Sequence, residues 1–452
     1  MSEPAVSHPI RRAAPRPPCI RPVARLLRSG IAIGLALTAG LCLTATPAWG
    51  HAELVDSSPG SGQEVIRSPR QLVFTFAEEP DPVHSVIQVL GADGRPAPGL
   101  SATKPFPGNP LQLLIDVDKP LVKGVYTVNW KTVSADDGHV DNGTLLFGVR
   151  ESPPKTSPFG ARLGATPSWL TAASAIGRWL IYAGLALLLG CAATCLISFR
   201  GAFPKVGGRV LLRGGWLAAM IGLAVVVLAE KRIVGAPSLL PLFQTSEGAD
   251  FIRLGEALGI CLAAVIVVDV WPRRSTLVFL GLAAAAAMLV LTRGTHADAP
   301  ATMRLFNLVD QWLHVLAVGV WVGGLAWLLL AVWKNPDIDR RPAVARFSTT
   351  AGIALAVVVA TGVLRAMAEL NGPRELFTTS YGRALLVKVA LVVVIAALGA
   401  LNRYRHVPAL RRRDDELVPF ERTVGGEVVV GALILAATAV LAGLAPPGGF
   451  LT

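Results

Sequence analysis

The chain has 452 residues, of which 52% are hydrophobic and only 16% are charged. Charged residues make up about 25% of an ordinary soluble domain, so this composition excludes a purely soluble protein. The formal charge of +12 is spread over short Lys and Arg clusters between apolar runs. Such clusters are typical of cytoplasmic membrane loops. We therefore expect the lipid bilayer, and no nucleic acid, as a partner.

Residues 1–50 predict a secretory signal peptide. Arginines and prolines fill the first part, an apolar run follows at 29–47, and Ala48 and Gly50 supply the small residues of a cleavage site. Cleavage after Gly50 makes His51 the first residue of the mature protein. An uncleaved anchor helix is the alternative.

Residues 51–150 predict an exported all-β, immunoglobulin-like sandwich. Short runs rich in β-branched and aromatic residues alternate there with Gly and Pro turns. Tyr126 and Trp130 fall at alternate positions of one run and are expected in its core. The segment contains no cysteine, so this core must stabilise it without a disulfide. Strands are expected at 72–76, 86–90, 113–117, 125–133 and 144–149.

A Pro- and Ser-rich linker is predicted at 151–173, an all-α bundle of eight transmembrane helices at 174–446, and a short tail at 447–452. Each apolar run has close to the roughly 20 residues that a bilayer requires. Lys and Arg cluster in alternate connections, which places these connections in the cytoplasm and residues 51–150 outside. We thus expect a multi-pass protein of the cell membrane, with helices at 175–198, 210–229, 252–271, 275–292, 305–333, 346–367, 381–401 and 424–445.

Three residues of the exported segment form a candidate Cu(II) site: His51, Asp137 and His139. A terminal histidine offers a metal both its α-amine and its imidazole, and a second imidazole extends the tetragonal nitrogen set that suits Cu(II). Asp137 and His139 are two residues apart, so on an extended segment both side chains point to the same side. His84 is expected at the surface, outside this site.

Several motifs of this segment resemble the periplasmic copper-binding protein CopC. They are His51-Ala-Glu-Leu, Phe74-x-Phe-Ala-Glu78, Tyr126-x-Val-x-Trp130 and Asp136-Asp137-Gly-His139. The resemblance implies that His51, Asp137 and His139 bind Cu(II), with Glu78 as a further candidate ligand. Residues 51–150 contain no methionine, so the thioether Cu(I) site of some family members is not expected.

The membrane half resembles CopD, the eight-helix partner of CopC in copper import and resistance. The motifs that carry this resemblance are Asp310-Gln-Trp-Leu-His314, Trp321-Val-Gly-Gly324, Arg346-Phe-Ser348, Thr361-Gly362 and Tyr381-Gly-Arg383. Ionisable residues inside a membrane mark ion pathways or pair with one another. We therefore predict an inward copper pathway past His296, Asp310 and His314. A His314 that is simply hydrogen-bonded between helices is the alternative.

Two other intramembrane features have two interpretations each. Lys388 is expected to snorkel or to pair with an acid, and Glu427 is a candidate for that acid. Cys191 and Cys195 are four residues apart on one helix face. They either bind a soft metal or pack as small polarizable side chains, and packing is the favoured interpretation.

These patterns predict a copper-binding membrane protein that captures Cu(II) outside and takes part in copper import, homeostasis and resistance, and that is not an enzyme. An extracytoplasmic copper donor or acceptor protein is an expected partner. A copper monooxygenase-like enzyme is one alternative, because such enzymes also use an N-terminal histidine chelate. A copper sensor or chaperone without transport is another.

Overall fold

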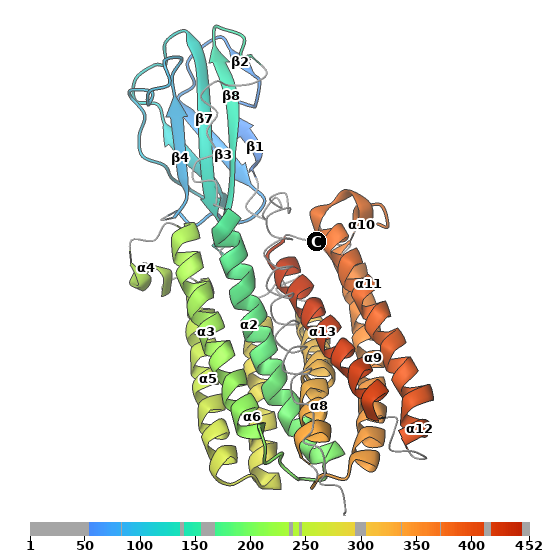
Figure 1. The fold of residues 1–452 in the computed structure, drawn as a ribbon. Helices are drawn as coiled ribbons and strands as arrows, with labels where there is room; N and C mark the ends of the chain where they lie inside the picture. The colour runs from blue at the N-terminus through green and yellow to red at the C-terminus, as the bar shows by residue number, and fades with distance from the viewer. Residues whose placement is uncertain are drawn as a thin grey trace, which may run out of the picture.

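The structure is a computed structural model of the full chain. It describes residues 54–82, 84–135, 140–154, 168–234, 238–243, 246–293, 304–335, 337–370, 372–410 and 417–444. These residues form a β-sandwich that stands on one end of a bundle of long helices (Figure 1).

The sandwich consists of two four-stranded sheets. The first has the order β1-β3-β6-β5, with β1 at Leu54–Ser58, β3 at Gln71–Phe76, β6 at Asn109–Asp116 and β5 at Lys104–Phe106. The second has the order β2-β8-β7-β4, with β2 at Glu64–Val65, β8 at Val140–Val149, β7 at Gly124–Val133 and β4 at Val86–Leu90. Only β2 and β8 pair in parallel among these strands.

The core between the two sheets comes from alternate residues of the predicted strands. Leu72, Phe74 and Phe76 on β3 are buried, as are Tyr126 and Trp130 on β7. The rings of Phe76 and Trp130 meet edge to face at 6.0 Å between centroids. This arrangement confirms the predicted core, because side chains two residues apart on a strand point to the same face.

The five predicted strands are present, and three further strands escaped the sequence pattern. Strand β1 has the sequence LVDSS, in which Asp and Ser replace an apolar alternation. Strand β2 has only two residues and β5 only three. Their positions depend on pairing with β3, β8 and β6 rather than on their own periodicity.

Eight helices in the described part of the chain are long and apolar enough to cross a membrane, as predicted. Three of them include a π-helical turn. In chain order the segments are α2 Ser168–Ala193 with η1 Thr194–Ser198, α3 Gly208–Val234, α5 Ser246–Val270, α6 Arg274–Arg293, α7 Arg304–Val318 with η2 Gly319–Gly323 and α8 Gly324–Lys334, α9 Arg340–Glu369, α11 Ser380–Leu401 with η3 Asn402–His406 and α12 Val407–Leu410, and α13 Leu417–Leu441. Short helices α4 Leu239–Phe243 and α10 Glu375–Thr378 lie in connections.

The connections that the charge pattern assigns to the cytoplasm contact one another. Lys205 Nζ, in the segment between α2 and α3, lies 2.9 Å from Asp337 Oδ2, in the segment between α8 and α9. Arg403 Nη1 of η3 donates a 3.0 Å hydrogen bond to the carbonyl of Ser348 on α9. These contacts join connections at the end of the bundle away from the sandwich (Figure 1).

Glycines bring the first and fifth membrane helices into backbone contact. A Cβ added to Gly323 would stand 1.8 Å from the carbonyl oxygen of Ala186, and one added to Gly190 would stand 2.3 Å from the carbonyl carbon of Gly323. Only glycine permits this approach, since small residues let the backbones of membrane helices come close together. Trp327 Nε1 donates to the carbonyl of Leu187 at 2.9 Å across the same interface.

Replacing Phe74 with alanine is expected to destabilise the sandwich by about 3–5 kcal/mol, because it leaves a cavity in the core. The measurement is urea unfolding of residues 51–150, followed by the fluorescence of Trp130, the one tryptophan of that segment. Val122→Ala is the matched control, since Val122 is 72% exposed. Equal stability of the two variants would contradict the assignment of Phe74 to the core.

Candidate functional site

One end of the sandwich gathers the segments that lead to the candidate copper ligands. His51, Asp137 and His139 themselves lie outside the described residues, as does His296. Leu54 of β1 pairs with Phe76, and Val140 of β8 pairs with Val133. Leu54 comes three residues after His51 in the chain, and an extended chain of that length spans about 10 Å at most.

Glu78 and Glu79 connect these segments to the residues before Asp137. The Ala135 N–H donates to the carbonyl of Glu79 at 2.8 Å, and Pro80 forms an isolated β-bridge with Ser134. The Ser134 hydroxyl also donates to Glu78 Oε2 at 2.9 Å. Glu78 therefore lies beside the end of β7, after which the chain continues to Asp137 and His139. A further ligand for the same ion would need this position. We call this end of the sandwich the capture corner.

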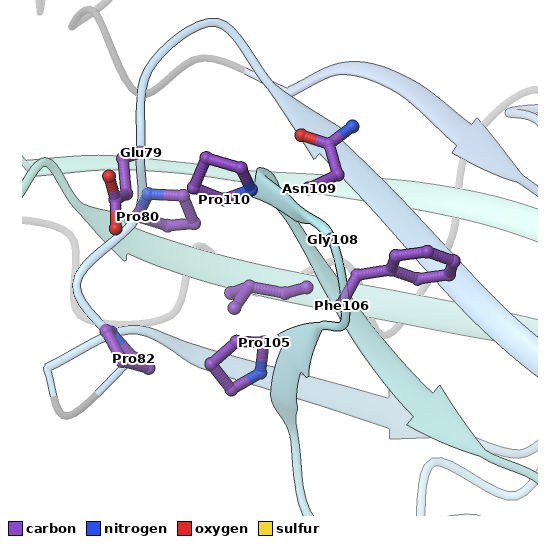
Figure 2. Close-up of a pocket in the computed structure, with 9 residues that line it drawn as sticks. Glu79, Pro80, Pro82, Pro105, Phe106, Gly108, Asn109 and Pro110 are labelled. Atoms are coloured by element: carbon purple, nitrogen blue, oxygen red, sulfur yellow. The ribbon is translucent and has the colours of Figure 1, made fainter.

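A shallow pocket of about 400 Å³ adjoins the capture corner. Figure 2 shows its proline rings, with Phe106 at the edge and Glu79 on one side. The wall is mostly apolar and contains one carboxylate, so the pocket itself offers little to a metal. Its lining residues are Glu79, Pro80, Pro82, Pro105, Phe106, Gly108, Asn109, Pro110 and Leu113.

The capture corner faces the membrane helices. Lys131, two residues before the end of β7, donates through Nζ to the carbonyl of Ile233 at 2.9 Å. Ile233 lies in the last turn of α3, at the end of the bundle beneath the sandwich (Figure 1). Burial lowers the pKa of Lys131. Because β7 runs from Gly124 to Val133, the contact turns its Val133 end toward the membrane.

His84 does not occupy the surface position that was expected for it. Its side chain is only 10% exposed, and its Nδ1 lies 2.8 Å from Asp81 Oδ2. The turn that carries it is held by Val133, whose carbonyl accepts from Asp81 N at 2.7 Å and whose N–H donates to Ser85 Oγ at 3.1 Å. His84 thus belongs to the packed base of the sandwich.

In the bundle, His314 on α7 is held by Thr361 on α9. His314 Nδ1 lies 2.8 Å from Thr361 Oγ1, and that hydroxyl lies 2.7 Å from the carbonyl of Val357. The single hydroxyl hydrogen goes to the carbonyl, so the oxygen accepts from Nδ1–H. In the neutral ring Nε2 then keeps its lone pair, which is the arrangement of a metal-binding histidine.

Charged residues of three helices surround this histidine. Arg365 and Glu369 on α9 form an ion pair one turn apart, and the Tyr381 hydroxyl donates to Glu369. Arg365 and Lys388 both act electrostatically on His314, while Arg365 and Glu369 act on the buried Asp310. With Asp310, Glu369, Arg365 and Lys388 ionised, two negative charges offset two positive charges. We call these residues, with His314 and Tyr381, the intramembrane cluster.

The cluster lies in the outer half of the bundle. His314 is ten residues from the start of α7, and Lys388 is eight residues from the start of α11. At about 1.5 Å per residue these positions are roughly 15 Å and 12 Å along their helices. The structure brings Asp310 and His314 into this one region. Sequence reasoning missed Arg365 and Glu369, although their i, i+4 spacing in an apolar helix signals an ion pair.

Glu427 is not the partner of Lys388. Its Oε1 accepts a hydrogen bond from Asn402 Nδ2, and both residues are buried. Lys388 instead lies in the electrostatic field of Glu369 and Arg365. The sequence could not distinguish these partners, because pairing depends on which helices are neighbours.

No group of three or more His, Cys, Asp or Glu side chains in the described part of the chain is arranged to hold a metal ion. The candidate ligands that the structure describes, Glu78, Asp310 and His314, therefore belong to no such group.

Variants of Lys131 test the seating of the sandwich on the bundle. Lys131→Met removes the ammonium and keeps the apolar stem. Without the hydrogen bond to Ile233 the sandwich should separate from the bundle more often, so trypsin should cut the linker at Lys155 or Arg162 roughly two- to tenfold faster in the detergent-solubilised chain. This range matches the roughly 0.5–1.5 kcal/mol of one hydrogen bond. Lys123→Met, at an exposed position of the same sandwich, should leave the rate unchanged. Equal rates for both variants would show that the Lys131 contact does not hold the sandwich.

Comparison with known proteins finds two family models in this one chain. The model described as CopC domain matches residues 54–150, and the model described as Copper resistance protein D matches residues 341–441. The second match covers α9 to α13, a smaller part than the 174–446 over which the motifs suggested CopD.

One relative covers most of the chain, and two others cover its first domain. The "Copper transport protein CutJ" of Bacillus subtilis (strain 168) is 28% identical over 424 residues, which cover 88% of this chain and 74% of CutJ. "Protein YobA" of Escherichia coli (strain K12) is 32% identical over 128 residues, 28% of this chain and 97% of YobA. The crystal structure of CopC from Methylosinus trichosporium OB3b shares 29% identity, covers 23% of this chain and 100% of its own, and gives a TM-score of 0.21.

Proposed function

The chain belongs to the CopC and CopD proteins, with both domains in one polypeptide, and on this basis we propose that it captures Cu(II) outside the cell membrane and passes copper inward through its helices. The chain is a multi-pass membrane protein with the CopC domain on the outer side. Copper is the cargo in this proposal, and transport rather than catalysis is the activity.

The orientation of the sandwich is the observation that carries the proposal. The Lys131–Ile233 contact turns the capture corner, rather than the opposite end, toward the helices. An ion bound between His51, Asp137 and His139 would then lie on the side of the sandwich that meets the bundle. A domain that only stores copper has no need of this orientation, whereas a domain that delivers it does.

Capture uses hard and borderline donors. The α-amine and imidazole of His51 and the imidazole of His139 supply nitrogens, and Asp137 supplies a carboxylate, a set that suits Cu(II). Glu78 is the further candidate, because its carboxylate stands at the capture corner beside Ser134. The two negative charges of Asp137 and Glu78 offset the charge of the ion. Protons compete for the amine and the rings, so capture weakens in acid.

Passage uses the neutral imidazole of His314 and the carboxylate of Asp310. The bond to Thr361 leaves Nε2 of His314 as the donor atom. Arg365 and Lys388 oppose additional positive charge at this point, and Asp310 and Glu369 offset them. The intramembrane cluster therefore accepts an ion for a short time rather than storing it, as conduction requires. His296, in the connection before α7, is the proposed entrance.

The free terminus of His51 provides the first test of capture. Residues 51–150 are prepared with His51 as the first residue and again with one added residue before it, and both are titrated with Cu(II). The added residue converts the amine to an amide, so affinity should fall by roughly tenfold or more, which corresponds to about 1.4 kcal/mol or more. The affinity of the native form should also fall between about pH 7.5 and pH 5.5. Equal binding by both forms would refute the terminal chelate.

The inward pathway is tested by copper accumulation in cells that express the full chain. His314→Ala should lower accumulation without changing the Cu(II) titration of the sandwich. Thr361→Val should also lower it, since loss of a residue that orients a ligand typically costs about 10–100-fold in metal affinity.

The control for Thr361 lies on the same helix. Thr350 also bonds the carbonyl four residues before it, Arg346 at 3.1 Å, but it belongs to no contact with His314. Thr350→Val should therefore accumulate copper as the unmodified chain does. A loss equal to that of Thr361→Val would mean that the Thr361 effect is structural and not a consequence of the His314 bond.

A further inference from the structure

The last turns of the first membrane helix contain two cysteines in contact. Cys191 lies two residues before the end of α2, and Cys195 lies in η1, four residues later. Both side chains are fully buried, and the two residues are four positions apart at the end of one membrane helix. Neither forms a disulfide. Two soft sulfur donors thus lie side by side near the cytoplasmic end of the bundle.

Two buried hydroxyls on the same turns lack a hydrogen-bond partner. Thr194 is 2% exposed and Ser198 is 1% exposed, and the Oγ1 of Thr194 and the Oγ of Ser198 have no partner in the described structure. Unsatisfied buried polar atoms are uncommon, and an ion or a water is a usual reason for them. Together with Cys191 and Cys195, these residues lie within eight consecutive positions at the end of α2 and in η1. We call the four residues the thiol turn.

The backbone of the thiol turn is itself unusual. Residues Thr194–Ser198 form a π-helical turn, a feature that occurs frequently at functional sites. The turn ends at Phe199, where the chain leaves the helix. A π turn widens the helix locally and moves side chains out of the ordinary α-helical register.

The thiol turn adjoins the helix that carries His314. The Thr194 hydroxyl lies 2.8 Å from the position that a Cβ on Gly324 would take, so it contacts the backbone of the fifth membrane helix. Gly324 follows His314 by ten residues, roughly 15 Å along a helix. One helix therefore connects the intramembrane cluster in the outer half to the thiol turn in the inner half.

The guanidinium of Arg346 contacts the thiol turn. Arg346 of α9 donates through Nε to the carbonyl of Ser198 at 2.9 Å, and its Nη2 donates to the same oxygen. No carboxylate of the described residues forms an ion pair with this guanidinium. Because an isolated charge in a bundle is costly, an anionic group at the thiol turn would stabilise it.

From these contacts we infer that Cys191 and Cys195 form a Cu(I) site at the inner end of the pathway. Thiolates select Cu(I), which accepts two sulfur ligands in a linear arrangement. One Cu(I) ion replaces the thiol proton of each cysteine and two protons are released. The resulting bis-thiolate complex carries one negative charge, which the guanidinium of Arg346 offsets. Binding involves no change of oxidation state, so Cu(II) captured outside must first gain one electron from a reductant outside this chain, such as a cellular thiol.

The inference relies on the proposed transport for the supply of copper, but binding can be measured separately. The full chain is purified in detergent and titrated under argon with Cu(I), in competition with bicinchoninate. Alanine replaces each cysteine, because serine would add another unpaired hydroxyl. Cys261, fully buried on α5, is the matched control.

Cys191→Ala and Cys195→Ala should each lose one Cu(I) per chain, together with the ultraviolet band of the Cu(I)–thiolate bond, while Cys261→Ala keeps both. Arg346→Gln should weaken binding without removing the band. Gel filtration and the Cu(II) titration of the sandwich verify that the variants fold. The inference is overturned if folded Cys191→Ala and Cys195→Ala bind Cu(I) as the unmodified chain does, or if Cys261→Ala loses as much.

Cellular copper accumulation distinguishes this outcome from failure of the proposed function. A chain that binds Cu(I) through Cys191 and Cys195 but does not raise accumulation would refute inward transport and leave the site intact. A chain that raises accumulation while both alanine variants retain full Cu(I) binding would refute the site and leave transport intact.

Discussion

The hydrogen bond from Lys131 to Ile233 fixes which end of the sandwich faces the membrane bundle. The last carbonyls of a helix have no partner within it and carry the negative end of its dipole. The carbonyl of Ile233 in the final turn of α3 is such a group, and the ammonium of Lys131 is its complement. Burial disfavours the charged amine and lowers the pKa of Lys131. The contact therefore stabilises both groups, because it gives the Ile233 carbonyl a donor and the buried ammonium an acceptor. Since Lys131 and Val133 belong to one strand, the same bond orients the capture corner.

Charge compensation is the second constraint, and it differs between the outside and the membrane. At the capture corner, carboxylates can face a divalent ion because water screens what remains. In the bundle each ionised group needs a partner, which explains the pairing of Arg365 with Glu369 and the hydrogen bond from Tyr381. At the thiol turn the positive charge of Arg346 has no carboxylate partner among the described residues. Under the proposals made above, the three locations receive a divalent ion, a transient ion and an anionic complex respectively.

The sequence was informative where one residue type repeats over a long stretch. Eight apolar runs predicted eight helices, and alternation along β3 and β7 predicted the buried faces of the sandwich. It was uninformative where contacts with neighbouring strands or helices determine the structure. Strand β1 exists because β3 offers it hydrogen bonds, and Glu427 bonds Asn402 because α13 packs against the end of α11.

The candidate sites follow the same division. The motifs point to His51, Asp137 and His139, which lie outside the described residues and stay predictions. For Asp310 and His314 the sequence indicated ionisable side chains within a membrane helix, but not the cations Arg365 and Lys388 beside them. The spacing of Cys191 and Cys195 was visible, whereas the unpaired hydroxyls of Thr194 and Ser198 and the charge of Arg346 appear only when helices are assembled.

The contact between Gly323 and Ala186 has a mechanical consequence. With no side chain between the two backbones, the first and fifth membrane helices cannot slide or tilt against each other without collision. This contact restricts movement between the helix that carries His314 and the helix that carries Cys191 and Cys195. A movement that opens a path for an ion is therefore expected in the helices around this pair. Helices α9 and α11, which carry Thr361, Arg365 and Lys388, leave many apolar side chains facing outward and pack against the bundle over a smaller part of their surface.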